Sequence, residues 1–389
     1  MKRFLAAVLS LASTVIVATG AQAADQPYTI NVVLPITGAG ALLGTTEQKT
    51  LELLESQVNK TGGIKGRPLK FTFFDDQSSP QVDVQLANQI AAGKPAVVIG
   101  SGISAMCASM QPVFEKAKIL QWCTSPTFYP PVGGYVYASL VGSKELMTGQ
   151  VRFMREKGYK RVAILATTDL TGKTGETELA EVLKQPENKG LTLVADEKFG
   201  VTDVSVSAQV AKIKATNPDA LIVWTAGTPL GTALAGLRDG SFPDIPVFVS
   251  SANMIYAQIT GLAAALPKTL YFQGFSYTAG VARSPLALKR VKEFQSAIAG
   301  SYLHLDTIAG IAWDPGMIVV DALRAVGPDA TAEQLRSWVA SQKAYPGISG
   351  IYNFTNDMHG LGVDDMLVVK WDPAKAKWVT ASKFGGSPL

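Results

Sequence analysis

The chain has 389 residues, with 35 lysines and arginines against 31 aspartates and glutamates, a formal net charge of +4. Removing the two cations Lys2 and Arg3 leaves +2, which is close to neutral and argues against nucleic acid or an anionic membrane as a partner. The two histidines, His304 and His359, stand far apart without a cysteine or carboxylate cluster at ligand spacing, so we expect no metal site and no cofactor.

Residues 1–23 have the pattern of a secretory signal peptide. Lys2 and Arg3 form a basic start, and 4–18 is an apolar stretch too short to span a membrane. Ala21-Gln22-Ala23 is an A-x-A cleavage site. We therefore expect a mature chain that begins at Ala24 and works in the periplasm, with about two domains on the prior of roughly 150 residues each.

After this segment, short β-branched runs alternate with amphipathic runs in two successive series. Each series reads strand, helix, strand, helix, which is typical of a parallel sheet in an α/β lobe. A helix with Leu51, Leu54 and Val58 on one face illustrates the helical periodicity. The predicted strands are 28–34, 68–74, 95–100 and 118–122 in the first series, and 161–167, 191–196, 219–225, 246–250 and 269–275 in the second.

Three helical patterns and two late strands follow, too few for a third domain. The helical patterns are Leu288–Ile298, Asp306–Val326 and Ala332–Ala340. They complete the first lobe and then the second, so the chain crosses between the lobes near Leu140, Phe275 and Tyr352. The predicted fold is α/β, with two Rossmann-like lobes of parallel sheets joined by three hinge crossovers. The N-terminal lobe comprises 24–140 and 276–352, and the C-terminal lobe comprises 141–275 and 353–389.

A glycine-rich loop, Thr37–Gly44, follows the first strand and opens a helix, as a phosphate-binding loop does. The second strand ends at Asp75-Asp76, 35 or more residues later, whereas a dinucleotide fingerprint places its acid about 20 residues on. We interpret the loop as a ligand-contacting turn that includes Thr37. Asp75 and Asp76 point to opposite sides and are expected to cap the following turn.

Enzyme chemistry has no good candidate residues. The sequence contains no G-x-S-x-G nucleophile elbow, and neither histidine has a serine or acid partner in view. We therefore expect a binding protein and not an enzyme.

Hydroxyl-rich loops follow five of the predicted strands, at the sheet edge where α/β proteins bind ligands. Serine and threonine also belong in ordinary turns, so it is the shared position that carries weight. Ser104 lies at a helix N-terminus, which favours an anion or carboxylate, although it could instead only cap that helix. Aromatic residues beside these loops could pack in the core or stack on a ligand. The candidate ligand-binding residues are Thr37, Ser101, Ser104, Ser125, Thr127, Asp169, Thr171, Thr228, Ser251 and Tyr277.

Cys107 and Cys123 are the only two cysteines. In an oxidising compartment such a pair is a disulfide candidate. A helix that begins near Cys107 and packs on the strand ending at Cys123 would let the two approach; two separate buried thiols are the alternative.

Four stretches resemble the leucine/isoleucine/valine-binding protein family of type I periplasmic solute-binding proteins. The similarity covers essentially all of the chain after residue 23, and the run from Gly62 to Asp76, "GGIKGRPL…DD", is the most distinctive part. The four stretches are 30–44, 58–80, 97–119 and 158–169.

The resemblance implies a monomeric protein that closes two lobes on a small ligand and delivers it to the permease and ATPase subunits of an ABC importer. It implies that Ser104 and Thr127 hold a ligand carboxylate, and that the loops at Thr171, Thr228 and Ser251 contribute second-lobe contacts.

This chain departs from the amino-acid-binding members in its second lobe. Those members usually set an acidic residue against the ligand's α-ammonium, but 249–254, "VSSANM", contains none. A buried ammonium without a carboxylate is strongly disfavoured. The stretches 119–126 and 312–327 resemble a subgroup that binds aromatic carboxylates. We therefore expect a small aromatic or hydrophobic carboxylate; branched-chain amino acid or amide binding, and a sensory receptor for a membrane kinase, are the alternatives.

Overall fold

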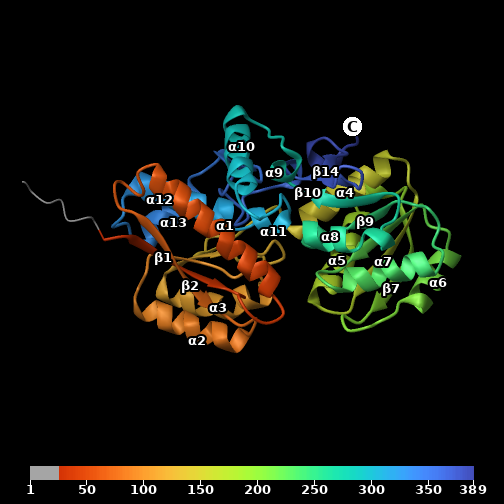
Figure 1. The fold of residues 1–389 in the computed structure, drawn as a ribbon, viewed down its shortest axis with the longest axis horizontal. Helices are drawn as coiled ribbons and strands as arrows, with labels where there is room; N and C mark the ends of the chain where they lie inside the picture. The colour runs from red at the N-terminus through yellow and green to blue at the C-terminus, as the bar shows by residue number, and fades with distance from the viewer. Residues whose placement is uncertain (1–25) are drawn as a thin grey trace, which may run out of the picture.

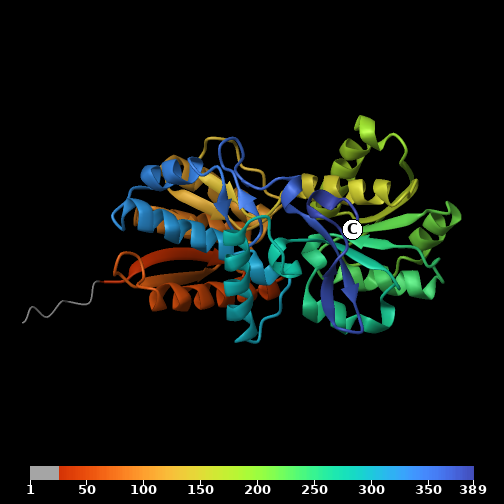
Figure 2. The same ribbon diagram turned by 90° about the horizontal axis from the view of Figure 1, so that it is seen from above.

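The computed structural model describes residues 26–389 and consists of two α/β lobes that lie side by side (Figure 1; Figure 2). The first lobe is built on a five-stranded sheet and the second on a seven-stranded sheet. The predicted fold class is confirmed. The expected signal peptide, 1–23, lies outside the described residues.

All strands of the first sheet run parallel, in the order β2-β1-β3-β4-β5. Side chains of β1 and β3 are buried on both faces, as a sheet covered by helices on both sides requires. β5 was not predicted, because three residues beside a proline- and glycine-rich turn show no pattern of their own until β4 pairs with them. The strands are β1 (Tyr28–Leu34), β2 (Leu69–Asp75), β3 (Val97–Ile99), β4 (Leu120–Cys123) and β5 (Val136–Ala138).

Helices from both ends of the chain pack on this sheet. The predicted apolar face of α1, with Leu51, Leu54 and Val58, is fully buried. The Thr50 hydroxyl on α1 donates to the Ala309 carbonyl oxygen over 2.9 Å and ties in the late helices. These helices are α1 (Ala41–Lys60), α2 (Pro80–Ala92), α3 (Ser104–Ala117), α11 (Thr307–Gly310), α12 (Trp313–Val326) and α13 (Ala332–Ala340).

The single helix predicted over Asp306–Val326 is two helices, α11 and α12, separated at residues 311–312. Pro315 stands in the first turn of α12, where its missing N–H costs no hydrogen bond. Asp306 caps α11 by accepting from the Ala309 amide over 3.1 Å. Periodicity continues across the break and so could not reveal it.

The second sheet has the order β14-β13-β10-β9-β8-β6-β7. Its five strands β6 to β10 run parallel, but β13 pairs antiparallel with β10 and with β14. This edge differs from the parallel sheets expected, because a short connection closes the β13–β14 pair and only an antiparallel pair permits that. The strands are β6 (Arg161–Thr167), β7 (Thr192–Phe199), β8 (Ala220–Trp224), β9 (Val247–Val249), β10 (Leu270–Gly274), β13 (Leu367–Asp372) and β14 (Lys377–Thr380).

The chain passes between the sheets after β5, after β10 and before β13. Helix α10 stands above the junction of the lobes in Figure 1. The residue boundaries assigned to the two lobes from the sequence stay predictions. The second-lobe helices are α4 (Ser143–Glu156), α5 (Leu170–Leu183), α6 (Ser207–Ala215), α7 (Pro229–Asp239) and α8 (Tyr256–Gly261); α9 (Ser276–Ala279), α10 (Pro285–Ala299), β11 (Tyr345–Pro346) and β12 (Ile351–Tyr352) lie along the connections.

Candidate functional site

Three of the predicted ligand-binding residues meet at the carboxyl end of the first sheet. The Ser104 hydroxyl lies 2.6 Å from the Ser125 hydroxyl and 2.5 Å from that of Thr127, and the last two are 3.3 Å apart. Ser104 is the first residue of α3, while Ser125 and Thr127 follow β4. We call these three residues the hydroxyl cluster. Hydroxyls can turn from one another to a polar ligand atom at little cost.

The cluster lies at the N-terminus of α3. Ile103 occupies the N-cap position and makes no side-chain cap, so Ser104 does not serve as the cap of this helix. The amides of Met106 and Cys107 both donate to the Ile103 carbonyl oxygen, over 3.0 Å each. The amides of Ser104 and Ala105 precede these bonds, at the positive end of the helix dipole. Amides and hydroxyls together form a set of donors suited to an anion.

A disulfide joins Cys107 on α3 to Cys123 at the end of β4, with a Cα–Cα distance of 5.8 Å. Both residues are buried against Phe128 and Val136. The predicted pairing is confirmed. The crosslink connects the two segments that carry the hydroxyl cluster.

Two other predicted residues, Thr37 and Ser101, are held by the aspartate pair. The Thr37 amide and hydroxyl donate to the two oxygens of Asp75, over 3.0 and 2.7 Å. The Ser101 hydroxyl donates to Asp76 over 2.9 Å. Both carboxylates also accept amides of the following turn, at Gln77 and at Ser78, as expected. Asp76, however, is fully buried and not solvated.

A buried carboxyl that the sequence analysis missed lies behind these loops. Glu47 on α1 is fully buried, and its Oε2 accepts from the Thr124 hydroxyl over 2.7 Å. Burial raises the pKa of Glu47 to about 8, against the opposing effect of the Thr124 hydrogen bond. The apolar face of α1 could have revealed it, because position 47 continues the series of Leu51, Leu54 and Val58.

The second-lobe candidates make hydrogen bonds within their own loops. Asp169 caps α5, accepting from the Gly172 amide over 3.1 Å and from the Thr167 hydroxyl over 2.6 Å. The Ser251 amide donates to Gln273 over 3.1 Å. Thr171 is half-buried and Thr228 exposed, near the starts of α5 and α7.

Polar atoms are left over in the second lobe. Thr225 Oγ1 and Gln273 Nε2, just after β8 and within β10, are buried and have no hydrogen-bond partner among residues 26–389. Such atoms normally find a partner.

Most of the aromatic residues beside the loops belong to the core. Tyr277 is fully buried, donates its hydroxyl to the Thr307 carbonyl oxygen over 3.0 Å and stacks on Phe275 at 5.7 Å. Burial raises its pKa well above the usual value. Trp122 and Trp224 are likewise buried. The Tyr277 side chain thus packs between α9, α10 and α11.

Tyr129 is the exception, and it connects the lobes. Its hydroxyl oxygen accepts from the Lys144 amide at the start of α4 over 3.0 Å and lies 3.3 Å from the Ser143 hydroxyl. Ser143 in turn donates to Glu178. The ring of Tyr129 packs on His359, with centroids 4.9 Å apart. Because Tyr129 stands two residues after Thr127, it links the loop that carries part of the hydroxyl cluster to the second lobe.

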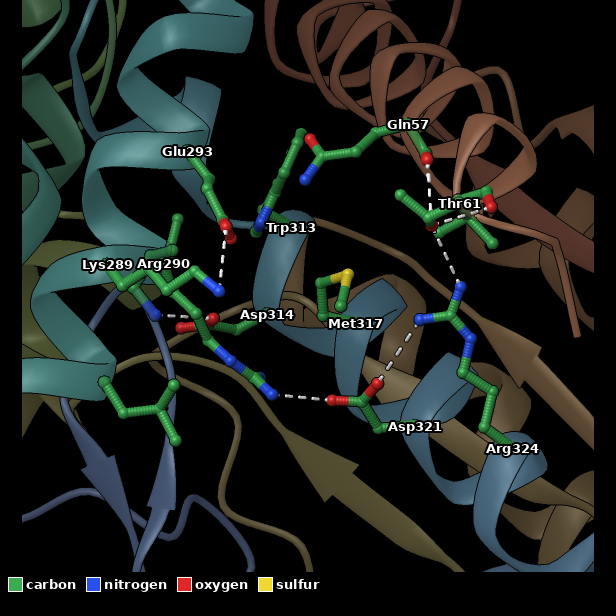
Figure 3. Close-up of a pocket in the computed structure, with 13 residues that line it drawn as sticks. Gln57, Thr61, Lys289, Arg290, Glu293, Trp313, Asp314, Met317, Asp321 and Arg324 are labelled. Atoms are coloured by element: carbon green, nitrogen blue, oxygen red, sulfur yellow. Dashed lines mark hydrogen bonds and ion pairs between the residues drawn. The ribbon is translucent and has the colours of Figure 1, made fainter.

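A cavity of about 300 Å³ opens elsewhere, between α1, α10 and α12 (Figure 3). Its charged side chains pair with one another: Asp321 contacts Arg290 at 2.8 Å and Arg324 at 3.8 Å. No residue of the hydroxyl cluster lines it. Its self-paired charges give no evidence for a ligand. Within residues 26–389 no group of three or more histidines, cysteines or carboxylates is arranged to hold a metal ion, and no helix has the length and apolar character that a membrane crossing requires.

Two α/β lobes joined by three crossings, with polar loops at the carboxyl ends of the sheets, define a two-lobed solute-binding protein. The sequence profile of the periplasmic binding protein family matches residues 27–377, so the chain belongs to that family, whose members are periplasmic or extracellular. The predicted resemblance to its leucine/isoleucine/valine-binding group is confirmed.

The individual proteins to which this chain is similar share less than a third of its residues in the matched parts. A Leu/Ile/Val-binding protein homologue from Brucella melitensis is 28% identical over 214 residues, covering 53% of this chain and 56% of that protein. The match thus spans about half the length of each protein. An extracellular ligand-binding receptor from Rhodopseudomonas palustris HaA2 has a TM-score of 0.77 at 21% identity, covering 92% of this chain and 99% of that one. A fatty acid ABC transporter substrate-binding protein from Thermomonospora curvata has a TM-score of 0.73 at 18% identity, covering 92% and 91%.

Proposed function

We propose that this chain is the periplasmic solute-binding component of an ABC importer, exported by the signal peptide at residues 1–23, and that it has no enzymatic activity. The ligand is a small carboxylate without an α-ammonium, with an aromatic or hydrophobic body. The observation that carries this proposal is the hydroxyl cluster at the N-terminus of α3. Three hydroxyls and the first helical amides converge there, and these donors match the oxygens of a carboxylate.

The second lobe supports the absence of an ammonium group. The segment 250–254 contains no acidic residue, and the Asp169 carboxylate already caps α5. An ammonium enclosed there would lack the charged partner that its desolvation requires. The fold itself accommodates such ligands, since the similar Thermomonospora curvata protein is named for fatty acid transport.

Branched-chain amino acid binding is the second candidate. It is favoured by the Brucella melitensis relative, whose name specifies leucine, isoleucine and valine.

Calorimetry separates the two candidates. The purified protein is titrated with benzoate, cinnamate, leucine and valine, after a thermal-shift screen of small metabolites. A ligand at about 100 times its dissociation constant adds roughly 2.7 kcal/mol to the folded state, so a true binder is readily seen. We expect heat from the plain acids. Tight binding of leucine or valine with no heat from the acids would overturn the ligand class and leave the transport role in place. Recovery of chemically altered ligand would overturn the binding-only role.

A further inference from the structure

Glu47 touches both loops that carry the hydroxyl cluster. Its Oε2 accepts from Thr124, the residue before Ser125. Its Oε1 has no hydrogen-bond partner among the described residues. Oε1 occupies the space that a Cβ at Gly102 would need, so the carboxyl packs directly against the backbone two residues before Ser104. A single side chain of α1 thus lies against the loop after β3 and the loop after β4.

The charges around Glu47 do not stabilise an ionised carboxylate. No ion pair of Glu47 occurs within residues 26–389, and the first two turns of α3 and the segment 121–128 contain no charged side chain. The charged group that acts on it is Asp76, whose negative charge adds to the effect of burial. Charged groups on the other elements packed against α1 bind partners other than Glu47. Lys70 pairs with Glu55, and Arg324 donates to the Gly63 carbonyl oxygen. The carboxylates accept backbone amides: Asp306 those of Tyr256 and Ala309, and Asp314 those of Ile348 and Ser349.

We propose that Glu47 is a positioning residue, and that the affinity of the hydroxyl cluster for an anion depends on whether the Glu47 carboxyl is protonated. In its neutral form it holds the two loops in register for binding at the hydroxyl cluster; ionised, it sets a negative charge beneath them. This inference rests on the proposed function, in which the cluster receives a carboxylate.

The direction of the pH dependence follows from the raised pKa. With a pKa of about 8, Glu47 is neutral below pH 8 and gains its charge as the pH rises through that value. A carboxylate ligand is ionised throughout this range. Affinity for an anion is therefore greatest below pH 8 and falls above it, because two like charges then face each other in a poorly solvated region. We expect a weakening of about tenfold, because Coulomb repulsion at an effective dielectric constant of about 20 reaches that size even for unit charges about 12 Å apart.

The test compares the wild type with Glu47→Gln, which keeps the shape of the side chain and cannot ionise; Glu47→Met is a second variant should the glutamine not be tolerated. Amide NMR resonances of Gly102, Ser104 and Ser125 are followed from pH 6.5 to 9.5 without ligand. We expect them to shift with one midpoint near 8 in the wild type and to stay constant in Glu47→Gln. Resonances that stay constant in the wild type would overturn the inference, whatever the ligand proves to be.

A matched control is Asp83→Asn. Asp83 on α2 is another buried carboxyl whose pKa burial raises to about 8, but it does not contact either loop through Thr124 or Gly102. The shifts of the loop amides should persist in Asp83→Asn. Their loss in that variant, with retention in Glu47→Gln, would assign the titration to Asp83 and overturn the role of Glu47.

The second measurement is calorimetry with benzoate over the same pH range. We expect its affinity to fall about tenfold in the wild type and to remain constant in Glu47→Gln. Equal pH profiles in the two proteins would overturn the inference. If benzoate binds at no pH while the loop amides still titrate, the proposed ligand class fails and the coupling to an anion fails with it, but the contact between Glu47 and the loops stands.

Discussion

The loops of the two lobes are built from the same residue types and use them differently. In the first lobe, the hydroxyls of Ser104, Ser125 and Thr127 bond to one another, beside the first amides of α3. In the second lobe, the Asp169 carboxylate caps α5, and the Ser251 amide donates to Gln273. The first set can exchange its mutual bonds for a ligand without dismantling a loop. The second set cannot, since its bonds hold the loops in shape.

This difference assigns separate tasks to the lobes. Under the proposed function, the first lobe binds the charged end of the ligand, and the disulfide keeps the segments that carry its donors together. The second lobe offers no acid at 250–254 and leaves Thr225 and Gln273 with unpartnered buried atoms. We therefore expect its loops to contact the body of the ligand and not its charged group.

Removing the crosslink should have the largest effect. The double variant Cys107→Ser, Cys123→Ser loses the constraint on a loop with a sequence separation of 16, and we expect the free energy of unfolding to fall by about 2–5 kcal/mol. Urea unfolding measures this change. Reduced wild type should unfold like the double variant, and equal stability with and without reductant would show that the crosslink contributes nothing.

Removing one hydroxyl of the cluster should weaken binding without unfolding the protein. Ser104→Ala is expected to cost about 1–3 kcal/mol of binding free energy for benzoate, the range for hydrogen bonds to charged groups. Calorimetry gives the value. Ser109→Ala is the matched control, because Ser109 lies on the same helix, its hydroxyl donates to the Met106 carbonyl oxygen, and it is not part of the hydroxyl cluster. Equal losses in both variants would contradict a ligand contact at Ser104.

The corresponding change in the second lobe should affect stability instead. Asp169→Ala removes the cap of α5, and we expect a loss of about 1 kcal/mol in the free energy of unfolding with little change in ligand affinity. Asp169→Asn keeps a capping oxygen and should retain most of the stability. A variant with wild-type melting and a large loss of affinity would place Asp169 in the ligand site and erase the contrast between the lobes.

The smallest effect is expected where the lobes meet. Tyr129→Phe removes the oxygen that accepts from the Lys144 amide, which should cost about 0.5–1.5 kcal/mol of stability. Thermal unfolding measures it, and small-angle scattering with and without ligand shows whether closure changes. Tyr135→Phe, which removes an exposed hydroxyl bonded to Glu333, is the control. Indistinguishable melting of the two variants would deny Tyr129 a special place between the lobes.

Features with local signals could be predicted from the sequence. The strand and helix series, the disulfide and the position of the hydroxyl-rich loops at strand ends all follow from periodicity, cysteine count and the topology of parallel sheets. Ser104, Ser125 and Thr127 could be named because their loops follow neighbouring strands β3 and β4.

Features that depend on contacts between residues distant in the chain could not be predicted from the sequence. β5 exists because β4 pairs with it, and the antiparallel edge at β13 depends on which strand it joins. The burial of Glu47 could be predicted from its place on the apolar face of α1, but its contacts with Gly102 and Thr124 could not. The sequence could not show that Tyr277 is buried or that the Thr307 carbonyl oxygen accepts its hydroxyl.

The late helices that cover the first sheet have a consequence for how the protein folds. Helix α12 packs near β3, α13 packs near β4, and the Thr50–Ala309 bond spans 259 residues of sequence. A ribosome produces the first sheet and strands β6 to β10 of the second before it produces the helices that complete the first lobe. The first lobe therefore cannot close its core until most of the second has been made, and long-range closure of this kind slows folding. The growing chain thus remains incompletely folded through most of its synthesis, which is the form in which a chain can still be threaded across a membrane.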